Sequence, residues 1–143
     1  MNTTLEVTLT WTGGGSDTDI DLAVREPYIG PGGSPIWTFA WYPGLWGAWS
    51  ANASGPSGTE KYTLYGPGEG PRGGHGDDAF YPLAVVFNGG TPATVTVTIK
   101  QNGVTDTYTF TLTTPGWYYA YTPGPPVRRW PNWWNNYPGP YVF

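Results

Sequence analysis

Two stretches in the second half of the chain alternate strictly between apolar residues and threonine. The apolar positions of residues 94–99 are valine and isoleucine, and those of residues 107–112 are tyrosine, phenylalanine and leucine. Successive side chains of a β-strand point to opposite faces of its sheet, so this period of two is typical of strands with one buried face. Asn102-Gly103 lies between the stretches, and both residues can adopt the positive φ of a two-residue hairpin turn. The sequence therefore predicts an antiparallel hairpin from Ala93 to Leu112.

Five further segments have the composition of strands. Most of them alternate between apolar and polar residues, but residues 80–87 form an almost continuous apolar run. We expect that strand to be covered on both faces or to lie centrally in one sheet, with Pro82 marking an edge or a bulge. With the hairpin included, the expected strands span residues 5–11, 20–24, 36–41, 61–65, 80–87, 94–99 and 107–112.

Glycine and proline separate these segments. The chain has 22 Gly and 16 Pro among its 143 residues, and both residue types disfavour the interior of helices. Seven or eight strands with one apolar and one threonine-rich face predict an all-β fold, a two-sheet antiparallel β-sandwich. We expect the sandwich domain to span residues 1–114, with an aromatic, Pro/Gly-rich insert at residues 28–57 and a C-terminal arm of similar composition at residues 115–143.

The charge of the chain limits its partners. The net charge is −4, from six basic and ten acidic residues, and the only adjacent basic pair is Arg128-Arg129. Such a chain offers no basic surface to a phosphate backbone, so we do not expect nucleic acid as a partner. No apolar run approaches the roughly 20 residues that span a bilayer, and residues 1–4 lack the features of a signal peptide. The absence of cysteine leaves the compartment open.

A resemblance to a known family rests on residues 18–27, Thr-Asp-Ile-Asp-Leu-Ala-Val-Arg-Glu-Pro. This segment resembles the T-D-x-D-L-x-V-x-x-P signature of a bacterial family of extracytoplasmic β-sandwich domains, which is similar to the pre-peptidase C-terminal domains. Residues 65–69 resemble the G-x-G-P-E turn of that family, and residues 85–111 resemble its terminal strands. The resemblance covers residues 5–112 and leaves the insert and the arm unexplained. It implies a sandwich fold and a non-catalytic, accessory role outside the cytoplasm, and it allows for calcium.

Five aspartates are candidate calcium ligands. Asp17, Asp19 and Asp21 are spaced by two, so we expect them to project from one face of the second strand. Asp77 and Asp78 lie in a glycine-rich loop and would come near that face if the fifth strand lay beside the second. Calcium takes six to eight oxygen ligands, which short carboxylates on a strand end and a loop can supply in part. The alternative is that Asp17 and Asp19 hydrogen-bond loop amides and that Asp21 is solvated.

The sequence offers little for catalysis. His75 is the only histidine, and no nucleophile elbow, cysteine nucleophile or paired-histidine metal motif is present. Glu60 and Glu69 could flank a glycosidic bond in principle, but such residues are more often surface charges. We therefore expect a protein that is not an enzyme, with His75 in a glycine-rich loop and no cofactor other than calcium.

The aromatic residues are too numerous for one sandwich core. Four tryptophans fall within or beside the insert, at Trp37, Trp41, Trp46 and Trp49, and most of the remainder lie in the arm. Aromatic rings bury large areas, and Trp and Tyr keep a polar group, so surplus rings favour interfaces and ligand platforms. Two functions follow from this surplus. The rings either pack against neighbouring copies of the chain or stack on the apolar faces of sugars.

We expect a structural subunit of a homomeric extracellular assembly, such as a filament, a sheath, a surface layer or a virion. The partners would be copies of the chain itself, contacted through the arm, although the arm could also fold back on its own domain. The candidate interface residues are Trp117, Arg128, Arg129, Trp130, Trp133, Trp134 and Tyr137. The alternative is a glycan-binding module, and its distinguishing feature would be a row of exposed Trp or Tyr rings flanked by polar side chains.

Overall fold

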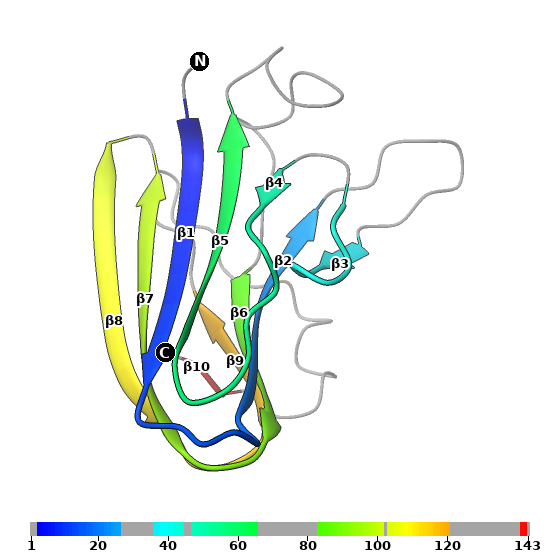
Figure 1. Ribbon diagram of the computed structural model, residues 1–143. Helices are drawn as coiled ribbons and strands as arrows, with labels where there is room; N and C mark the ends of the chain where they lie inside the picture. Colours follow the sequence, from blue (N-terminus) through cyan, green and yellow to red (C-terminus); the bar gives the residue numbers. More distant parts are fainter. Residues whose placement is uncertain are drawn as a thin grey trace.

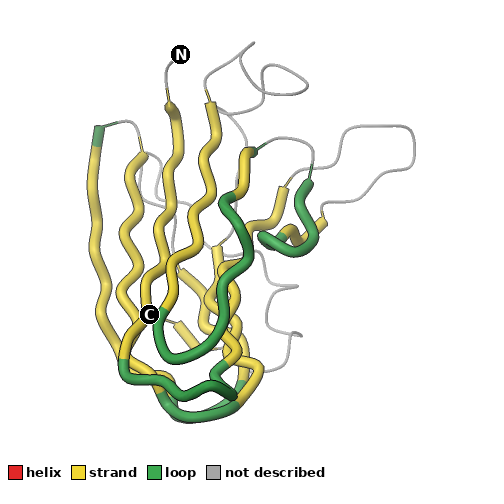
Figure 2. Tube along the Cα trace, viewed as in Figure 1, coloured by secondary structure: helices red, strands yellow, loops and turns green. Residues whose placement is uncertain are grey.

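The computed structural model describes residues 3–26, 36–44, 47–65, 83–101, 103–120 and 141–142. Within these residues the chain forms two five-stranded sheets that lie face to face as two layers (Figure 1). The described loops between strands gather mainly at one end of the molecule, at the bottom of the view (Figure 2). This arrangement confirms the predicted all-β sandwich. In the same residues no helix is long and apolar enough to cross a membrane.

The first sheet has the strand order β4-β5-β1-β7-β8, and the second has the order β10-β9-β6-β2-β3. Neighbouring strands are antiparallel except for β10 and β9, which run parallel. The strands are β1 (Thr3–Thr12), β2 (Asp19–Glu26), β3 (Ile36–Thr38), β4 (Ala48–Trp49), β5 (Gly58–Tyr65), β6 (Leu83–Gly89), β7 (Ala93–Gln101), β8 (Val104–Leu112), β9 (Gly116–Ala120) and β10 (Tyr141–Val142).

Seven of these strands correspond to the seven that the sequence predicts. β7 and β8 form the expected hairpin, because Gln101 pairs with Val104 and leaves a two-residue connection. Gly103 in that connection has a φ of 82°, a conformation that glycine adopts without strain. The apolar run ends in β6, which lies between β9 and β2 and is buried on both faces from Leu83 to Phe87. Pro82 lies outside the described residues.

The inner faces of both sheets form one apolar core. Every second residue of β1, β7 and β2 points into it. Burial alternates along β1 and β7, whereas β2 is buried on both faces from Ile20 to Val24. Trp11, Tyr62 and Phe87 are the largest fully buried apolar side chains. The outer face of the first sheet is rich in threonine, and the Thr96 and Thr109 hydroxyls lie 3.2 Å apart across β7 and β8.

Two buried glutamates connect the layers. Glu60 on β5 is fully buried, and its carboxylate accepts hydrogen bonds from the Leu22 N–H of β2 and from the Ala53 N–H, each at 3.0 Å. Glu26 on β2 accepts hydrogen bonds from the Tyr62 hydroxyl of β5, at 2.7 Å, and from a loop N–H. The expectation that Glu60 is a surface charge is therefore wrong, because its side chain faces the other sheet.

The expected boundary after residue 114 is also wrong. Residues 116–120 form β9, which pairs along its whole length with β6 and is part of the second sheet. Tyr141 and Val142 then return to pair with Tyr118 and Tyr119 of the same chain. The sandwich therefore includes the first residues of the segment that the sequence assigns to an arm, and the chain comes back to this sheet near its end.

Candidate ligand-binding site

The outer face of the second sheet carries polar residues at the end where β2 begins. Side chains of β2 alternate, so Asp19 and Asp21 project away from the core. The same alternation turns Val86 and Asn88 of β6 outward, and the adjacent β9 contributes Trp117 to this face. Three neighbouring strands thus bring together two carboxylates, one amide and one indole.

A tight turn after β3 places further aromatic rings over this face. Phe39 and Tyr42 exchange two backbone N–H to O hydrogen bonds, each 3.0 Å long, which close the turn. The Phe39 and Trp41 rings stack, with centroids 4.8 Å apart and an interplanar angle of 12°. Trp37 and Phe39 both contact the Trp117 ring edge-on, with centroid distances of 4.9 and 6.1 Å. The aromatic residues therefore support one another in a fixed cluster.

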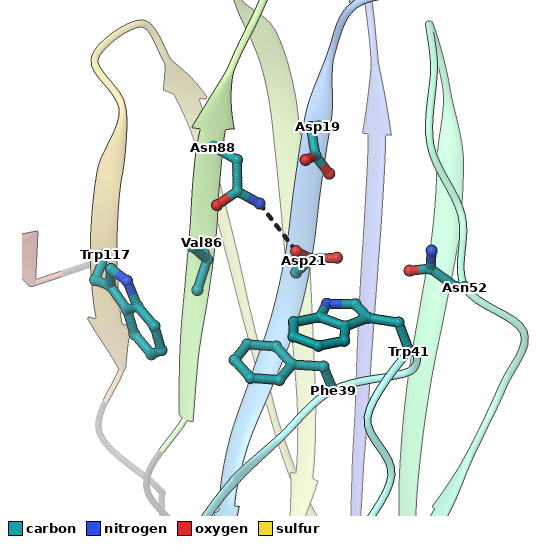
Figure 3. A pocket seen from close by; sticks show the side chains of 8 residues that line it. All are labelled: Asp19, Asp21, Phe39, Trp41, Asn52, Val86, Asn88 and Trp117. Carbon is teal, nitrogen blue, oxygen red and sulfur yellow. Dashed lines mark hydrogen bonds between the residues drawn. The ribbon is translucent and has the colours of Figure 1, made fainter.

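These side chains surround a concavity of about 550 Å³. Figure 3 shows Phe39 and Trp41 on one side of it, Asp19 and Asn88 on the opposite side, and Trp117 and Asn52 at the flanks. The Trp41 side chain remains 56% exposed, so its ring is available to a ligand. The lining residues are Asp19, Asp21, Phe39, Trp41, Asn52, Val86, Asn88 and Trp117.

Asp21 is the polar centre of the concavity. It is only 6% exposed, and its carboxylate accepts a hydrogen bond from the Asn88 side-chain amide at 2.9 Å, with the Trp41 side chain beside it (Figure 3). Burial raises the pKa of Asp21, and the negative charge of the nearby Asp19 raises it further, against the opposing effect of the Asn88 and Trp41 side chains. Behind the strand, burial likewise raises the pKa of Glu60 to about 7, and Asp21 and Asp19 add to that rise. The charges of Asp19 and Asp21 therefore contribute a negative field at these two carboxyl groups, in addition to the larger effect of burial.

The structure brings together only part of the predicted calcium set. Asp19 and Asp21 share the outer face as expected, but β2 begins at Asp19, so Asp17 lies in the preceding loop. The Asp17 carboxylate accepts hydrogen bonds from the hydroxyl and the N–H of Thr91, at 2.7 and 3.1 Å, which lower its pKa. Asp17 thus bonds a loop amide, as in the alternative to calcium binding. The other part of that alternative, a solvated Asp21, is wrong, because Asp21 is buried and bonded to Asn88.

Asp77 and Asp78 lie outside the described residues. β6 lies beside β2, as the calcium hypothesis required. The two strands are antiparallel, so Leu83 at the start of β6 pairs with Val24, and Asp19 pairs with Gly89 at the other end of β6. Among the residues that the structure describes, no group of three or more His, Cys, Asp or Glu side chains is placed to hold a metal ion. Calcium binding stays a prediction.

Of the predicted interface residues, Trp117 alone falls within the described ranges, on β9 at the edge of the concavity. The other predicted interface residues lie outside the described ranges: Arg128, Arg129, Trp130, Trp133, Trp134 and Tyr137. His75 and Trp46 lie outside these ranges as well.

Comparisons with known proteins identify no matching family model, no similar curated protein and no similar solved structure. The resemblance to the bacterial extracytoplasmic sandwich family therefore stays a prediction.

Sequence reasoning missed four residues of the concavity: Phe39, Asn52, Val86 and Asn88. Alternation along the run at residues 80–87 could have placed Val86 and Asn88 on the face opposite Val85 and Phe87. Phe39 and Asn52 carry no such signal, because a turn and a loop bring them to the sheet.

Proposed function

We propose that the concavity binds carbohydrate and that the protein is a non-catalytic glycan-binding module. The observation that supports this proposal is the exposed Trp41 ring, backed by Phe39 and bordered by the carboxylates and amides of the concavity. An exposed ring flanked by polar side chains is one element of the feature that would distinguish a glycan-binding module, namely a row of such rings.

The chemistry of the lining suits a sugar. A pyranose ring has apolar C–H faces and a rim of hydroxyl groups, so it needs an aromatic surface and several hydrogen-bonding groups around it. Trp41 offers the surface at little entropic cost, because the stacked Phe39 ring supports it. The Asp19 carboxylate can accept hydrogen bonds from sugar hydroxyls, and the amides of Asn52 and Asn88 can donate and accept them.

The arrangement of the carboxylates favours binding over hydrolysis. Asp19 and Asp21 are two residues apart on one strand face, so both approach a ligand from the same side. A glycosidase requires two carboxyl groups that flank the scissile bond. The proposed module therefore holds a glycan without cleaving it, and a location outside the cytoplasm, where structural polysaccharides occur, belongs to the same proposal.

Co-sedimentation with insoluble polysaccharides tests this function. The protein is mixed with particles of cellulose or chitin, and the bound fraction is measured over a range of particle concentrations. Trp41→Ala should weaken retention at least about tenfold, corresponding to about 1.4 kcal/mol of binding free energy. Tyr42→Ala is a matched control, because Tyr42 is also 56% exposed and lies in the same turn but does not line the concavity.

The control should retain binding. Equal retention of the Trp41→Ala variant and the wild-type protein would show that the concavity is not the glycan site. The expected homomeric assembly through residues 115–143 stays a second prediction, tested separately below.

A further inference from the structure

The described residues that line the concavity include two carboxylates and no basic group. Among these described residues Asp19 and Asp21 are the only charged ones, and the amides of Asn52 and Asn88 are neutral. The nearest basic residue along β2 is Arg25, four positions beyond Asp21, which corresponds to about 14 Å of strand. Its guanidinium lies 6.0 Å from the centre of the Trp37 ring, beside the aromatic cluster. Lys61 pairs instead with Glu6 at 3.3 Å on the outer face of the first sheet.

The two carboxylates lie close enough to repel each other. Residues two apart on a strand are separated by about 7 Å, and Asp21 has lost most of its contact with water. Within the part of the chain that the structure describes, no ion pair to either carboxylate is present. A nearly buried charge without a counter-ion is costly, because neutral hydrogen-bond donors compensate it only in part. A ligand cation entering the concavity would supply the missing positive charge.

The aromatic wall also suits a cation. The Trp41 ring lies beside Asp21 and is open to solvent, and the face of an indole ring attracts ammonium groups that approach within about 6 Å. A sugar with an amino group can use both features together. Its C–H face would stack on the ring, while its ammonium group would donate charge-assisted hydrogen bonds to the carboxylates.

We propose that the concavity selects glycans whose sugars carry protonated amino groups, such as polymers of glucosamine, over neutral and uronic-acid glycans. This inference rests on the proposed glycan-binding function and specifies its ligand. A uronic acid would place its negative charge against Asp19, so we expect the concavity to reject it.

Three oligosaccharides with the same β-1,4 backbone test the selection. Hexamers of glucosamine, N-acetylglucosamine and glucose differ only at carbon 2. A difference in their affinities therefore measures the effect of the ammonium group separately from that of ring stacking. Isothermal titration at about pH 6 keeps amines protonated and ordinary carboxylates ionised. We expect the glucosamine hexamer to bind about tenfold more tightly than the other two. The preference should shrink in 1 M salt, where the screening length falls to about 3 Å.

Two variants test whether the carboxylates of the concavity cause the preference for the glucosamine hexamer. Asp19→Asn should reduce the preference for the glucosamine hexamer, because Asp21 alone then remains to attract the ammonium group, while binding of the glucose hexamer persists because Asp19 is exposed and the stacking surface is unchanged. Asp106→Asn removes one negative charge from β8 in the other sheet and should leave the preference intact.

Equal affinity for the three hexamers would overturn the inference and leave the proposed function standing. An equal loss of preference in both variants would also overturn it, because the effect would then be non-specific attraction to an acidic protein. If no hexamer bound and no polysaccharide retained the protein, the proposed function itself would fail.

Discussion

Replacing Glu60 with glutamine should change how the stability of the sandwich depends on pH. The Glu60 carboxylate is fully buried between the sheets and accepts hydrogen bonds from the N–H groups of Leu22 and Ala53. Burial raises its pKa from the ordinary 4.5 to about 7 in spite of these bonds, and the negative charges of Asp21 and Asp19 contribute to the rise. The folded protein therefore holds a proton at Glu60 more tightly than the unfolded chain does.

The sign of the effect follows from this difference. Because the pKa is higher in the folded state, the contribution of Glu60 to the free energy of unfolding is fully present below pH 4.5 and is lost as the pH rises through about 7. One pH unit corresponds to about 1.4 kcal/mol, so a rise in pKa from 4.5 to about 7 corresponds to about 3 kcal/mol. The wild-type protein should lose about this much stability relative to Glu60→Gln between about pH 4.5 and pH 8.

The glutamine side chain keeps one acceptor oxygen and loses the other. One backbone N–H is left without its partner, which lowers the stability of the variant by about 1–3 kcal/mol at every pH. This constant offset does not change how the difference in free energy of unfolding between the two proteins varies with pH. Urea unfolding followed by tryptophan fluorescence at several pH values gives the free energy of both proteins. A stability difference between them that stays constant from acid to alkaline pH would refute the reasoning.

A control variant separates burial from charge. Glu6 lies on the outer face of the first sheet and pairs with Lys61 at 3.3 Å. Glu6→Gln makes the same chemical change at a partly exposed ion pair, and it should alter the free energy of unfolding by less than about 1 kcal/mol.

Three further predictions concern other parts of the molecule. Tyr62→Phe removes a buried hydroxyl that donates to Glu26 at 2.7 Å, and it should lower the free energy of unfolding by about 1–3 kcal/mol in urea titrations; an unchanged midpoint would contradict this. If Asp19 and Asp21 contribute to a calcium site, calcium at a hundred times its dissociation constant should add about 2.7 kcal/mol of stability. A melting temperature indifferent to calcium and to chelator would dispose of that site. If the C-terminal arm joins subunits, sedimentation should find full-length oligomers and a monomer when residues 122–143 are removed, and a monomeric full-length chain would disprove the arm hypothesis. The cut must follow β9, because a chain ending at residue 115 would also lose that strand of the sandwich.

The fold could be predicted because its strongest signals are local. Alternation and the Asn-Gly turn of the β7–β8 hairpin lie within twenty residues of sequence, and the structure reproduces the hairpin with a two-residue connection. β9 was missed for a local reason as well. Its sequence Gly-Trp-Tyr-Tyr-Ala has no polar residue to mark an alternation, and it stands beside a proline-rich segment that favours an extended arm.

The burial of Glu60 shows where residue type misled the interpretation. Along β5, Glu60 has the same parity as Tyr62 and Leu64, which are both buried, whereas Thr59 and Lys61 are exposed. The same alternation would place Glu60 in the interior, but the expected strand began at residue 61, and the charge of Glu60 suggested the surface. The charge is tolerated because two backbone N–H groups meet it, one from the facing sheet and one from a loop. Neither donor could be identified from the sequence.

Some features of the candidate site depend on neighbouring residues in the sequence, and others depend on contacts between residues far apart in the sequence. Parity correctly predicted that Asp19 and Asp21 share an outward face, since that property depends on β2 alone. Whether such a face is a solvated patch or a binding surface depends on what covers it, and here the cover is the turn that carries Phe39 and Trp41. That turn directly follows β3, which pairs with β2, and Phe39 also contacts Trp117, a residue 78 positions further along the chain. The aromatic residues were recognised as surplus to the core, but the sequence did not show that this strand pairing and this ring contact place some of them beside the two carboxylates.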